Sequence, residues 1–432
     1  MDSLWTKTAA RPAFDRLEGD ARTDALVIGG GMAGILCAYM LRRAGVDCML
    51  IEAERICGGV TAGTTAKLTL QHGLFCDKML RRFGTERTAA YIRAQQRAIE
   101  EYRRLCEAVP CDFEERPSVV YSRTDRERIE REVRALERVG VFAEFTAETC
   151  LPFAVTGAVR VEGQAQLHPL KLAFALAQEL PIYEHTRALE WRPDGVITDR
   201  GRIRAERVVV ATHFPFLRWR GGFFLKMYQH RSYVLGLENV PKMDGMYVDE
   251  DSGGLSFRGC GELLLLGGGA HRTGKRGGGW RELEAFAGMR YPDARVVERW
   301  ATQDCMTLDA LPDIGQYSRK TPQLYVETGF QKWGMSTSML SAMLLTELLQ
   351  GRRSELSELL SPSRSIWRPQ LIGNIGHAAL GLLTPTAPRC PHLGCALKYN
   401  RQEHSWDCSC HGSRFSETGE VLDNPANGDK WG

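Results

Sequence analysis

Two short stretches near the end of the printed sequence carry residues that could bind a metal. The first holds Cys390 and His392 in a Cys-x-His pattern, and the second holds Cys408 and His411 in a Cys-x-x-His pattern. Two thiolates and two imidazoles can hold a [2Fe–2S] cluster, with both cysteines on one iron and both histidines on the other. The same ligand set also suits a structural zinc ion, so these four residues alone leave both metals open.

Further residues in the same two loops favour the cluster. Cys395 and Cys410 lie at matching places in the two loops, accompanied by Gly394 and Gly412. A zinc site needs no second pair of cysteines. With these additions the chain here resembles a Rieske domain of the disulfide-containing kind. The resemblance implies that Cys390, His392, Cys408 and His411 bind a [2Fe–2S] cluster. It also implies that Cys395 and Cys410 form a disulfide. It further implies exposed histidine ligands through which electrons would leave.

The resemblance to a Rieske domain is incomplete at its beginning. Such domains usually carry several strands before the first ligand loop, whereas only a short stretch separates Pro369 from Arg389. We therefore expect a truncated Rieske domain over residues 387–432. A domain that lacks its base strands must be covered by other parts of the protein, so we expect the cluster region to pack against the main body.

A nucleotide-binding pattern lies close to the start of the sequence. An apolar strand over residues 23–28 runs into Gly29, Gly31 and Gly34, and a helix is predicted over residues 35–44. This is the G-x-G-x-x-G motif in its required context of a preceding strand and a following helix. The first glycine permits the tight turn, the second lets the backbone approach a pyrophosphate, and the third allows close helix–strand packing. The helix amino terminus would bind the phosphates.

The residues that follow identify the nucleotide. A second strand over residues 47–51 ends at Glu52, which is placed to accept hydrogen bonds from a ribose. The next loop is rich in small and hydroxyl residues and includes Thr61, Thr65 and Lys67. It resembles the second flavin-contacting segment of the D-amino-acid-oxidase and glycine/sarcosine-oxidase superfamily. The resemblance implies FAD as the cofactor.

The middle of the chain fits the same superfamily. A continuous apolar run over residues 207–212 is typical of a buried parallel strand, and residues 228–266 alternate like an antiparallel sheet. The resemblance implies that this sheet roofs the flavin, with His271 and Arg272 presented toward it as catalytic residues. A solvated basic loop is the alternative. Residues 267–274 are a poor second dinucleotide loop, because Arg272 replaces the third glycine.

A glycine turn before a predicted helix over residues 335–349 completes the resemblance. The superfamily places such a turn against the flavin ring, where the helix amino terminus would stabilise negative charge. The residues implied are Gly329, Lys332, Trp333, Gly334 and Met335, with Lys332 as a third candidate catalytic residue. Sarcosine oxidases carry a lysine where this chain has Ser336, so a sarcosine-type substrate is not expected.

The overall composition restricts the class of protein. The chain has 432 residues and a net charge of +3, which argues against a nucleic-acid-binding or anionic-membrane surface. Residues 1–22 are polar and charged, unlike a signal peptide, and no transmembrane segment is predicted. Nine cysteines scattered through residues 1–305 indicate a reducing compartment, so a cytoplasmic location is expected.

Together these patterns predict an α/β protein, α+β overall, that has a Rossmann-type FAD-binding domain, an antiparallel-sheet substrate domain and a small all-β Rieske domain. The predicted division is 1–350 for the oxidoreductase, 351–386 for a linker with a docking segment, and 387–432 for the Rieske domain. Within the oxidoreductase, the FAD-binding parts are about 23–75, 150–215 and 300–350, and the substrate-domain parts are about 76–149 and 216–299.

The pairing of flavin and cluster suggests a function. FAD takes two electrons as hydride, whereas the cluster carries one electron at a time. We expect oxidation of a small-molecule amine or amino acid, with single electrons leaving through the cluster to an acceptor protein. Reversed flow, with a donor protein feeding a flavin reductase, and a non-catalytic redox-sensing or electron-carrier module are the alternatives. A Rieske oxygenase is disfavoured because no mononuclear iron site of two histidines and a carboxylate is apparent.

Overall fold

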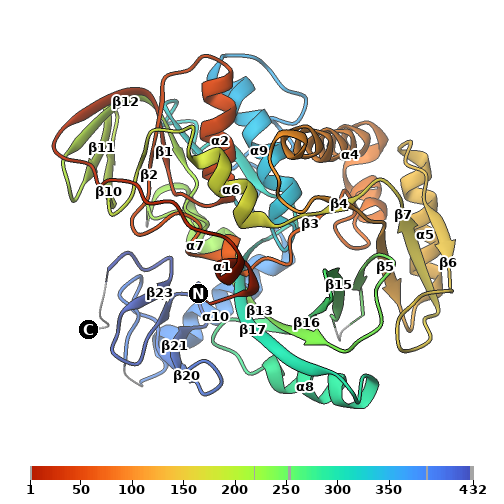
Figure 1. Cartoon of the computed structure of the whole chain (residues 1–432). Coiled ribbons are helices and arrows are strands. Elements are labelled where there is room, and N and C mark those ends of the chain that lie inside the picture. Colours follow the sequence, from red (N-terminus) through yellow and green to blue (C-terminus); the bar gives the residue numbers. More distant parts are fainter. Residues whose placement is uncertain (1, 218, 252–253, 386–387, 429–432) are drawn as a thin grey trace.

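The computed structural model describes residues 2–217, 219–251, 254–385 and 388–428 (Figure 1). Two large sheets form the body of the protein, and a small sheet near the C-terminus packs beside them. The boundary expected at residues 386 and 387 and the end of the predicted Rieske domain lie outside the described residues.

The first sheet has a parallel centre, as the apolar runs predict. Its neighbouring strands β12, β1 and β2 pair in parallel, and β19 and β9 extend the parallel set on either side. Side chains on both faces of this centre are buried, which explains the continuous apolar sequences. The parallel strands are β1 (Ala21–Ile28), β2 (Cys48–Ile51), β9 (Ile182–Tyr183), β12 (Arg202–Val210) and β19 (Leu324–Thr328). The antiparallel strands are β10 (Ala188–Arg192), β11 (Gly195–Thr198) and β18 (Asp313–Gln316).

Helices cover the first sheet and bury its largest apolar cluster. The helix after the glycine motif packs against the helix predicted at residues 335–349, and both contribute buried aliphatic side chains. The long helix α4 bends at Gly84, whose φ is +78°. The helices of this part are α1 (Leu4–Thr8), α2 (Met32–Arg43), α3 (Val60–Gly63), α4 (Cys76–Ala108), α6 (Pro169–Ala177) and α9 (Gly334–Leu349).

The second sheet is antiparallel except where β14 pairs with β5. Long strands β13, β16 and β17 dominate it: β13 pairs with both β16 and β17, while β7 pairs with β5 and β6. β7 and the end of β17 fall within residues 150–215 and 300–350, which the sequence assigned to the FAD-binding parts; that division stays a prediction. Its strands are β5 (Ser118–Ser122), β6 (Glu144–Thr146), β7 (Gly157–Val161), β13 (Met227–Glu238), β14 (Met246–Asp249), β15 (Ser256–Cys260), β16 (Leu263–Arg272) and β17 (Arg295–Thr307). Beside them lie α5 (Arg126–Arg138), α8 (Gly279–Arg290), and a small sheet of β3 (Lys67–Leu68), β4 (Glu114–Glu115) and β8 (Ala165–Gln166).

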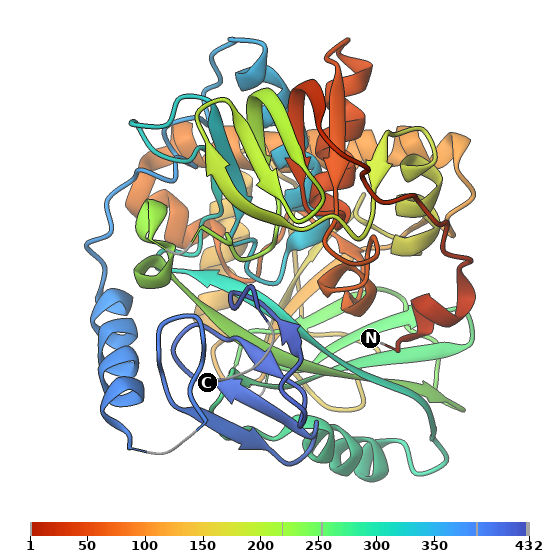
Figure 2. The ribbon, with the colours of Figure 1, turned by 90° about the vertical axis from the view of Figure 1, so that its left-hand side faces the viewer.

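The C-terminal part consists of one helix and a four-stranded antiparallel sheet. It lies across strands β13 and β17, with the helix standing at the edge of the molecule (Figure 2). The elements are α10 (Pro369–Leu383), β20 (Leu397–Asn400), β21 (Ser405–Cys408), β22 (Arg414–Phe415) and β23 (Val421–Asp423). A short helix of the body, α7 (Phe223–Lys226), contacts α10 and follows a 3-10 turn at Arg220–Gly222.

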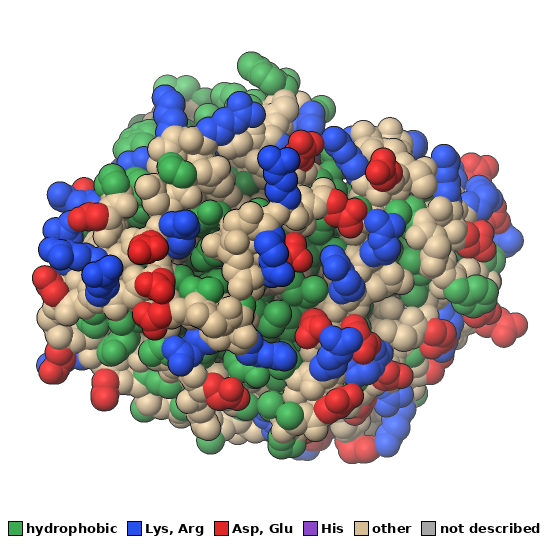
Figure 3. Space-filling view, turned by 90° about the horizontal axis from the view of Figure 1, so that it is seen from above, with side chains coloured by type: hydrophobic (Ala, Val, Ile, Leu, Met, Phe, Trp, Pro, Cys, Tyr) green, Lys and Arg blue, Asp and Glu red, His purple; other side chains and the backbone are tan. Residues whose placement is uncertain are grey.

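Across the described ranges, no helix is both long and apolar enough to cross a bilayer. Acidic and basic side chains are both spread over the face seen from above (Figure 3).

Candidate functional site

The glycine motif forms the expected turn between β1 and α2. Gly29 has a φ of +114°, and a Cβ atom on Gly34 would lie only 1.9 Å from the carbonyl oxygen of Gly29. Glycine is therefore required both for the turn and for the close approach of helix to strand. Gly31 borders a cavity, where the amino-terminal N–H groups of α2 are suited to bind phosphate.

A cavity of about 1030 Å³ lies next to this turn. It is lined by almost every residue that the sequence assigned to the cofactor, while Gly34 lies behind the wall at the helix–strand contact. The predicted residues at the wall are Gly29, Gly31, Glu52, Thr61, Thr65, Lys67, Gly329, Lys332, Trp333, Gly334 and Met335. The volume, the glycine turn and the helix amino terminus together fit a dinucleotide such as FAD.

Two of the predicted nucleotide residues hold the turn itself in shape. The Glu52 carboxylate accepts hydrogen bonds from the backbone N–H groups of Gly30, at 2.7 Å, and Glu54, at 3.0 Å. The Thr61 hydroxyl accepts one from the Met32 N–H at 3.0 Å. Burial raises the pKa of Glu52, against the lowering effect of these backbone donors. A ribose-binding role for Glu52 stays a prediction.

The cavity wall also carries two half-buried basic side chains, Lys67 and His72. The Lys67 ammonium donates to the hydroxyls of Thr65 and Ser256, both at 3.2 Å, and burial lowers its pKa to about 7. Burial also lowers the pKa of His72 to about 3, so this imidazole is neutral. His72 stacks on Trp333, with ring centroids 5.2 Å apart and ring planes 7° from parallel. Trp333 therefore packs against His72 while it borders the cavity.

The floor of the cavity is a polar strip on the second sheet. Ser232 of β13 lies opposite Thr302 of β17, and both hydroxyl oxygens are buried without a hydrogen-bond partner among the described residues. Asp304 and Lys332 border the same space. Burial raises the pKa of Asp304 to about 7, against the pull of Lys332, and burial lowers the pKa of Lys332. The strip thus offers an acid and a base to a bound molecule.

The predicted placement of His271 and Arg272 toward the flavin is wrong. His271 stacks on Tyr233 and does not border the cavity. Arg272 donates to the carbonyl oxygens of Ser409, at 3.1 Å, and Cys410, at 3.0 Å. The end of β16 passes beneath the C-terminal part, so Arg272 holds a metal-binding loop instead of reaching the cavity.

The four predicted metal ligands converge. Their side chains are all buried, the thiols of Cys390 and Cys408 are hydrogen-bonded, and the rings of His392 and His411 lie 5.0 Å apart at 88°. The Nδ1 atom of His411 is buried and has no hydrogen-bond partner among the described residues, as expected for a metal-binding nitrogen. Two sulfur and two nitrogen donors fit a [2Fe–2S] cluster with mixed ligation.

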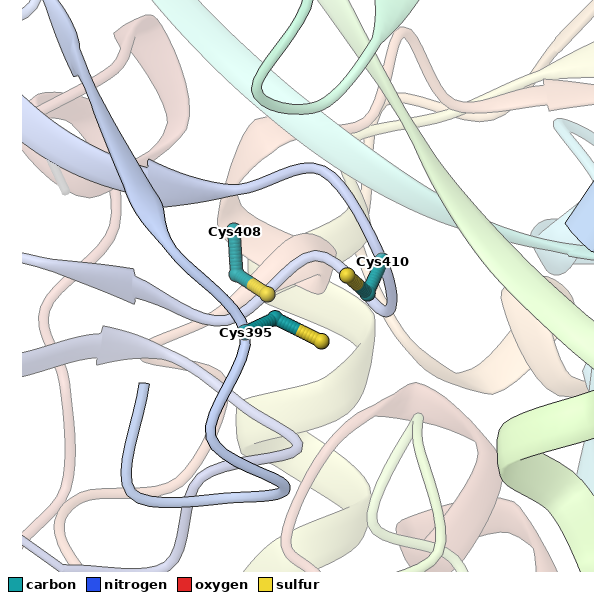
Figure 4. A group of neighbouring side chains, drawn as sticks. All are labelled: Cys395, Cys408 and Cys410. Carbon is teal, nitrogen blue, oxygen red and sulfur yellow. The ribbon is translucent and has the colours of Figure 1, made fainter. Parts of the chain in front are cut away.

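The second cysteine pair lies beside these ligands. The sulfur atoms of Cys395, Cys408 and Cys410 point toward one another and lie within 4.8 Å (Figure 4). Every cysteine in the described part of the chain is a free thiol, so the disulfide between Cys395 and Cys410 stays a prediction.

The histidines are not exposed, which corrects the expectation drawn from other Rieske domains. His392 is 3% exposed and His411 is 4% exposed. The ring of Phe214 meets that of His392 edge-on, with the ring centroids 6.2 Å apart. The rings of Phe224 and His411 meet in the same way, with the centroids 6.3 Å apart. Both aromatic residues belong to the body, so the histidine edge of the metal site faces inward.

Amide side chains of the second sheet bind the metal-binding loop through its backbone. Gln229 donates to the carbonyl oxygens of His411, at 3.1 Å, and Asn424, at 2.6 Å, while Gln303 donates to that of Gly412 at 2.9 Å. Asn424 in turn donates to Phe214 O at 3.1 Å. The stretch 421–427 consequently borders the cavity beside the glycine motif.

A buried ion-pair network fixes the same interface. Arg231 of β13 donates to Glu403 at 2.9 Å, and Arg414 donates to Glu403 and Asp423, both at 2.8 Å, and to Asp407 at 3.0 Å. Both arginines and Glu403 are nearly inaccessible. Burial alone would raise the pKa of Glu403, but the two arginines lower it to about 2. Buried ion pairs thus hold the C-terminal part against the body.

Family comparisons agree with this geometry. The FAD-dependent oxidoreductase family model matches residues 24–348, and the Rieske [2Fe–2S] domain model matches residues 377–429. The putative Rieske 2Fe-2S iron-sulfur protein YhfW of Bacillus subtilis is 31% identical, with 98% of this chain and 96% of that protein aligned. The Rieske match resolves the choice between zinc and the cluster.

One further curated protein and one solved structure match about four fifths of this chain. Gamma-glutamylputrescine oxidoreductase of Escherichia coli is 25% identical over 78% of this chain and 86% of that protein. The crystal structure of glycine oxidase from Geobacillus kaustophilus has a TM-score of 0.68 at 20% identity, covering 80% of this chain and all of that one. That structure shares the fold of the body.

Proposed function

Because the chain belongs to the FAD-dependent oxidoreductase family and carries a Rieske [2Fe–2S] domain, we propose that it oxidises an amine or amino acid and passes the electrons singly through the cluster to an acceptor. FAD, when bound, supplies the two-electron chemistry and the cluster supplies the one-electron chemistry. The observation that carries the proposal is that the Rieske residues 421–427 border the same cavity as the glycine motif.

A chain of contacts between the two cofactor sites supports electron transfer between them. The stretch that follows β12 borders the cavity at Thr212 and His213, and its next residue, Phe214, contacts the ring of His392. The histidine edge of the cluster site is therefore the edge nearest this part of the cavity wall. Electrons from the flavin would enter at the histidines, instead of leaving through them as the sequence suggested.

The polar strip supports an amine or amino-acid substrate. Asp304 suits an ammonium or amine group, and Lys332 suits a carboxylate. The unpaired hydroxyls of Ser232 and Thr302 offer further hydrogen bonds to a bound substrate. Because these two hydroxyl oxygens are buried, a ligand that pairs with them relieves unsatisfied polar groups.

The test is a screen of amino acids and amines with the holoprotein under anaerobic conditions. We expect at least one compound to bleach the oxidised flavin absorbance and then produce the EPR signal of a reduced Rieske cluster. Bleaching of the flavin with a cluster that stays oxidised would contradict the internal electron route, and no bleaching by any amine would contradict the substrate class.

Replacing Lys332 is expected to weaken substrate binding selectively. Lys332→Met removes the cationic partner of the substrate carboxylate, a charge-assisted contact worth about 1.5–3 kcal/mol, or roughly tenfold to a hundredfold in KM. Flavin content should stay unchanged. The matched control is Lys78→Met, since Lys78 also borders the cavity but belongs to α4 and not to the glycine turn. Equal KM values for both variants and the natural protein would show that Lys332 does not bind the substrate.

A further inference from the structure

The side of helix α10 that faces the protein is not mainly apolar. Its inward side holds Leu371 together with small and polar residues. Asn374 donates to Leu225 O at 3.1 Å and accepts from Arg272 at 3.0 Å. Gly381 lies so close to the metal-binding loops that a Cβ atom there would be 2.5 Å from the sulfur of Cys410. The contacts with the body thus depend largely on hydrogen bonds and on a close glycine approach.

The outward side of α10 is apolar, and so is Trp367, two residues before the helix. Six of the thirteen large apolar side chains that are exposed among the described residues fall in this one segment. We call them the apolar face of α10: Trp367, Ile372, Ile375, Leu380, Leu382 and Leu383. Ile372 is 76% exposed and Leu383 is 80% exposed, and the helix stands at the edge of the molecule with nothing packed outside it (Figure 2). Contiguous exposed apolar surface on this scale marks a binding surface.

The chain segment that carries this face has basic but no acidic side chains. The sequence contains no aspartate or glutamate from residue 359 to residue 402. Lys398 and Arg401 lie within that stretch and are exposed. Lys275, contributed by the body, is also exposed, and with burial and Lys398 it lowers the pKa of His377 on α10. The whole-chain charge of +3 averages over this local excess of positive charge.

These charges distinguish between possible occupants. A second copy of the chain that docked through the same face would bring one basic face against another, because a two-fold interface uses the same surface on both copies. That arrangement places like charges together. An anionic lipid surface provides both an apolar layer for the exposed side chains and negative headgroups for Lys275 and Lys398, which lie close to His377 on α10.

We propose that the apolar face of α10 docks into the surface of a lipid bilayer containing anionic phospholipids. The helix is too short to cross the bilayer, so it would lie in the plane of the interface, with Trp367 at the headgroup level. The Cys410 sulfur donates to His377 O at 3.6 Å, which places the metal-binding loops directly beneath the docked helix. This proposal is independent of the substrate and of the direction of electron flow.

The test is co-sedimentation of the full-length holoprotein with phosphatidylcholine vesicles, with and without phosphatidylglycerol. We expect binding to the vesicles that contain phosphatidylglycerol and weaker binding at high salt. The double variant Ile372→Asp/Leu383→Asp should bind at least about tenfold more weakly, since it removes two aliphatic contacts with the bilayer and adds negative charge. Its flavin and cluster absorbance should match the natural protein, because both side chains point outward.

Phe142→Asp is the matched control, because Phe142 is 81% exposed but lies outside α10. It should bind vesicles as the natural protein does. Failure of the natural protein to sediment with either vesicle would overturn the proposal, as would equal loss in the control. A lipid-independent dimer that the double variant converts to a monomer would instead assign the face to a second copy and overturn the lipid assignment.

Discussion

His411→Ala is expected to abolish the Rieske EPR signal and the iron content while leaving the flavin in place. The imidazole is one of four buried donors at the metal site, and alanine provides none. The loop itself should remain docked, because Gln229 and Gln303 bind the backbone carbonyl oxygens of residues 411 and 412, which the substitution keeps. Iron analysis and flavin absorbance on one sample measure both effects.

His404→Ala provides the control for this variant. His404 lies in the same C-terminal part but is 72% exposed and contacts only surface groups. It should retain full iron and flavin content. An intact cluster in His411→Ala would show that this histidine is not a cluster ligand. Loss of flavin together with iron would show that the cluster holds the C-terminal part in place against the cavity.

Glu403→Gln is expected to detach the Rieske domain from the body more readily. The substitution removes the buried negative charge shared by Arg231 and Arg414, and breaking a buried ion pair on one side costs about 3–5 kcal/mol. Because the metal-binding loops depend on this interface, the urea midpoint for loss of the cluster absorbance should fall. Glu417→Gln, at an exposed carboxylate of the same domain, should leave that midpoint unchanged.

The same carboxylate predicts how the interface depends on pH. Its folded-state pKa of about 2 lies below the ordinary value of 4.5, so its stabilising contribution is complete above pH 4.5 and is lost as the pH falls toward 2. The natural protein should therefore lose resistance to urea over this range, whereas Glu403→Gln should lack that part of the change. Parallel pH profiles for the two proteins would contradict this role for Glu403.

Local patterns in the sequence were sufficient for the cofactor-binding elements. The strand before Gly29, the helix that begins within the glycine motif at Met32 and the turn at Gly329 depend on backbone conformation and apolar periodicity, which neighbouring residues determine. The ligand spacing around Cys390 and Cys408 is equally local. These parts of the fold and of the candidate site were predicted without knowledge of distant contacts.

Features that depend on distant pairing were not predicted. Asp304 reaches the cavity because β17 pairs with β13, and the run of three polar residues from Thr302 to Asp304 does not reveal this pairing. Arg272 was placed by analogy at a strand end, but it is bound by a loop more than a hundred residues later in the chain. Burial of His392 likewise follows from docking against Phe214, which ligand spacing cannot reveal.

The cavity wall at residues 421–427 also bears on how the protein is assembled. This stretch follows every other lining residue in the chain, so a ribosome-bound intermediate has a cavity that is open along one side until these residues emerge. A flavin captured earlier would be exposed to solvent there, and the closing segment would retain it. The carbonyl oxygen of Asn424, in that segment, accepts a hydrogen bond from the same glutamine that binds the His411 loop, so one side chain of the body holds both the closing segment and the metal-binding loop.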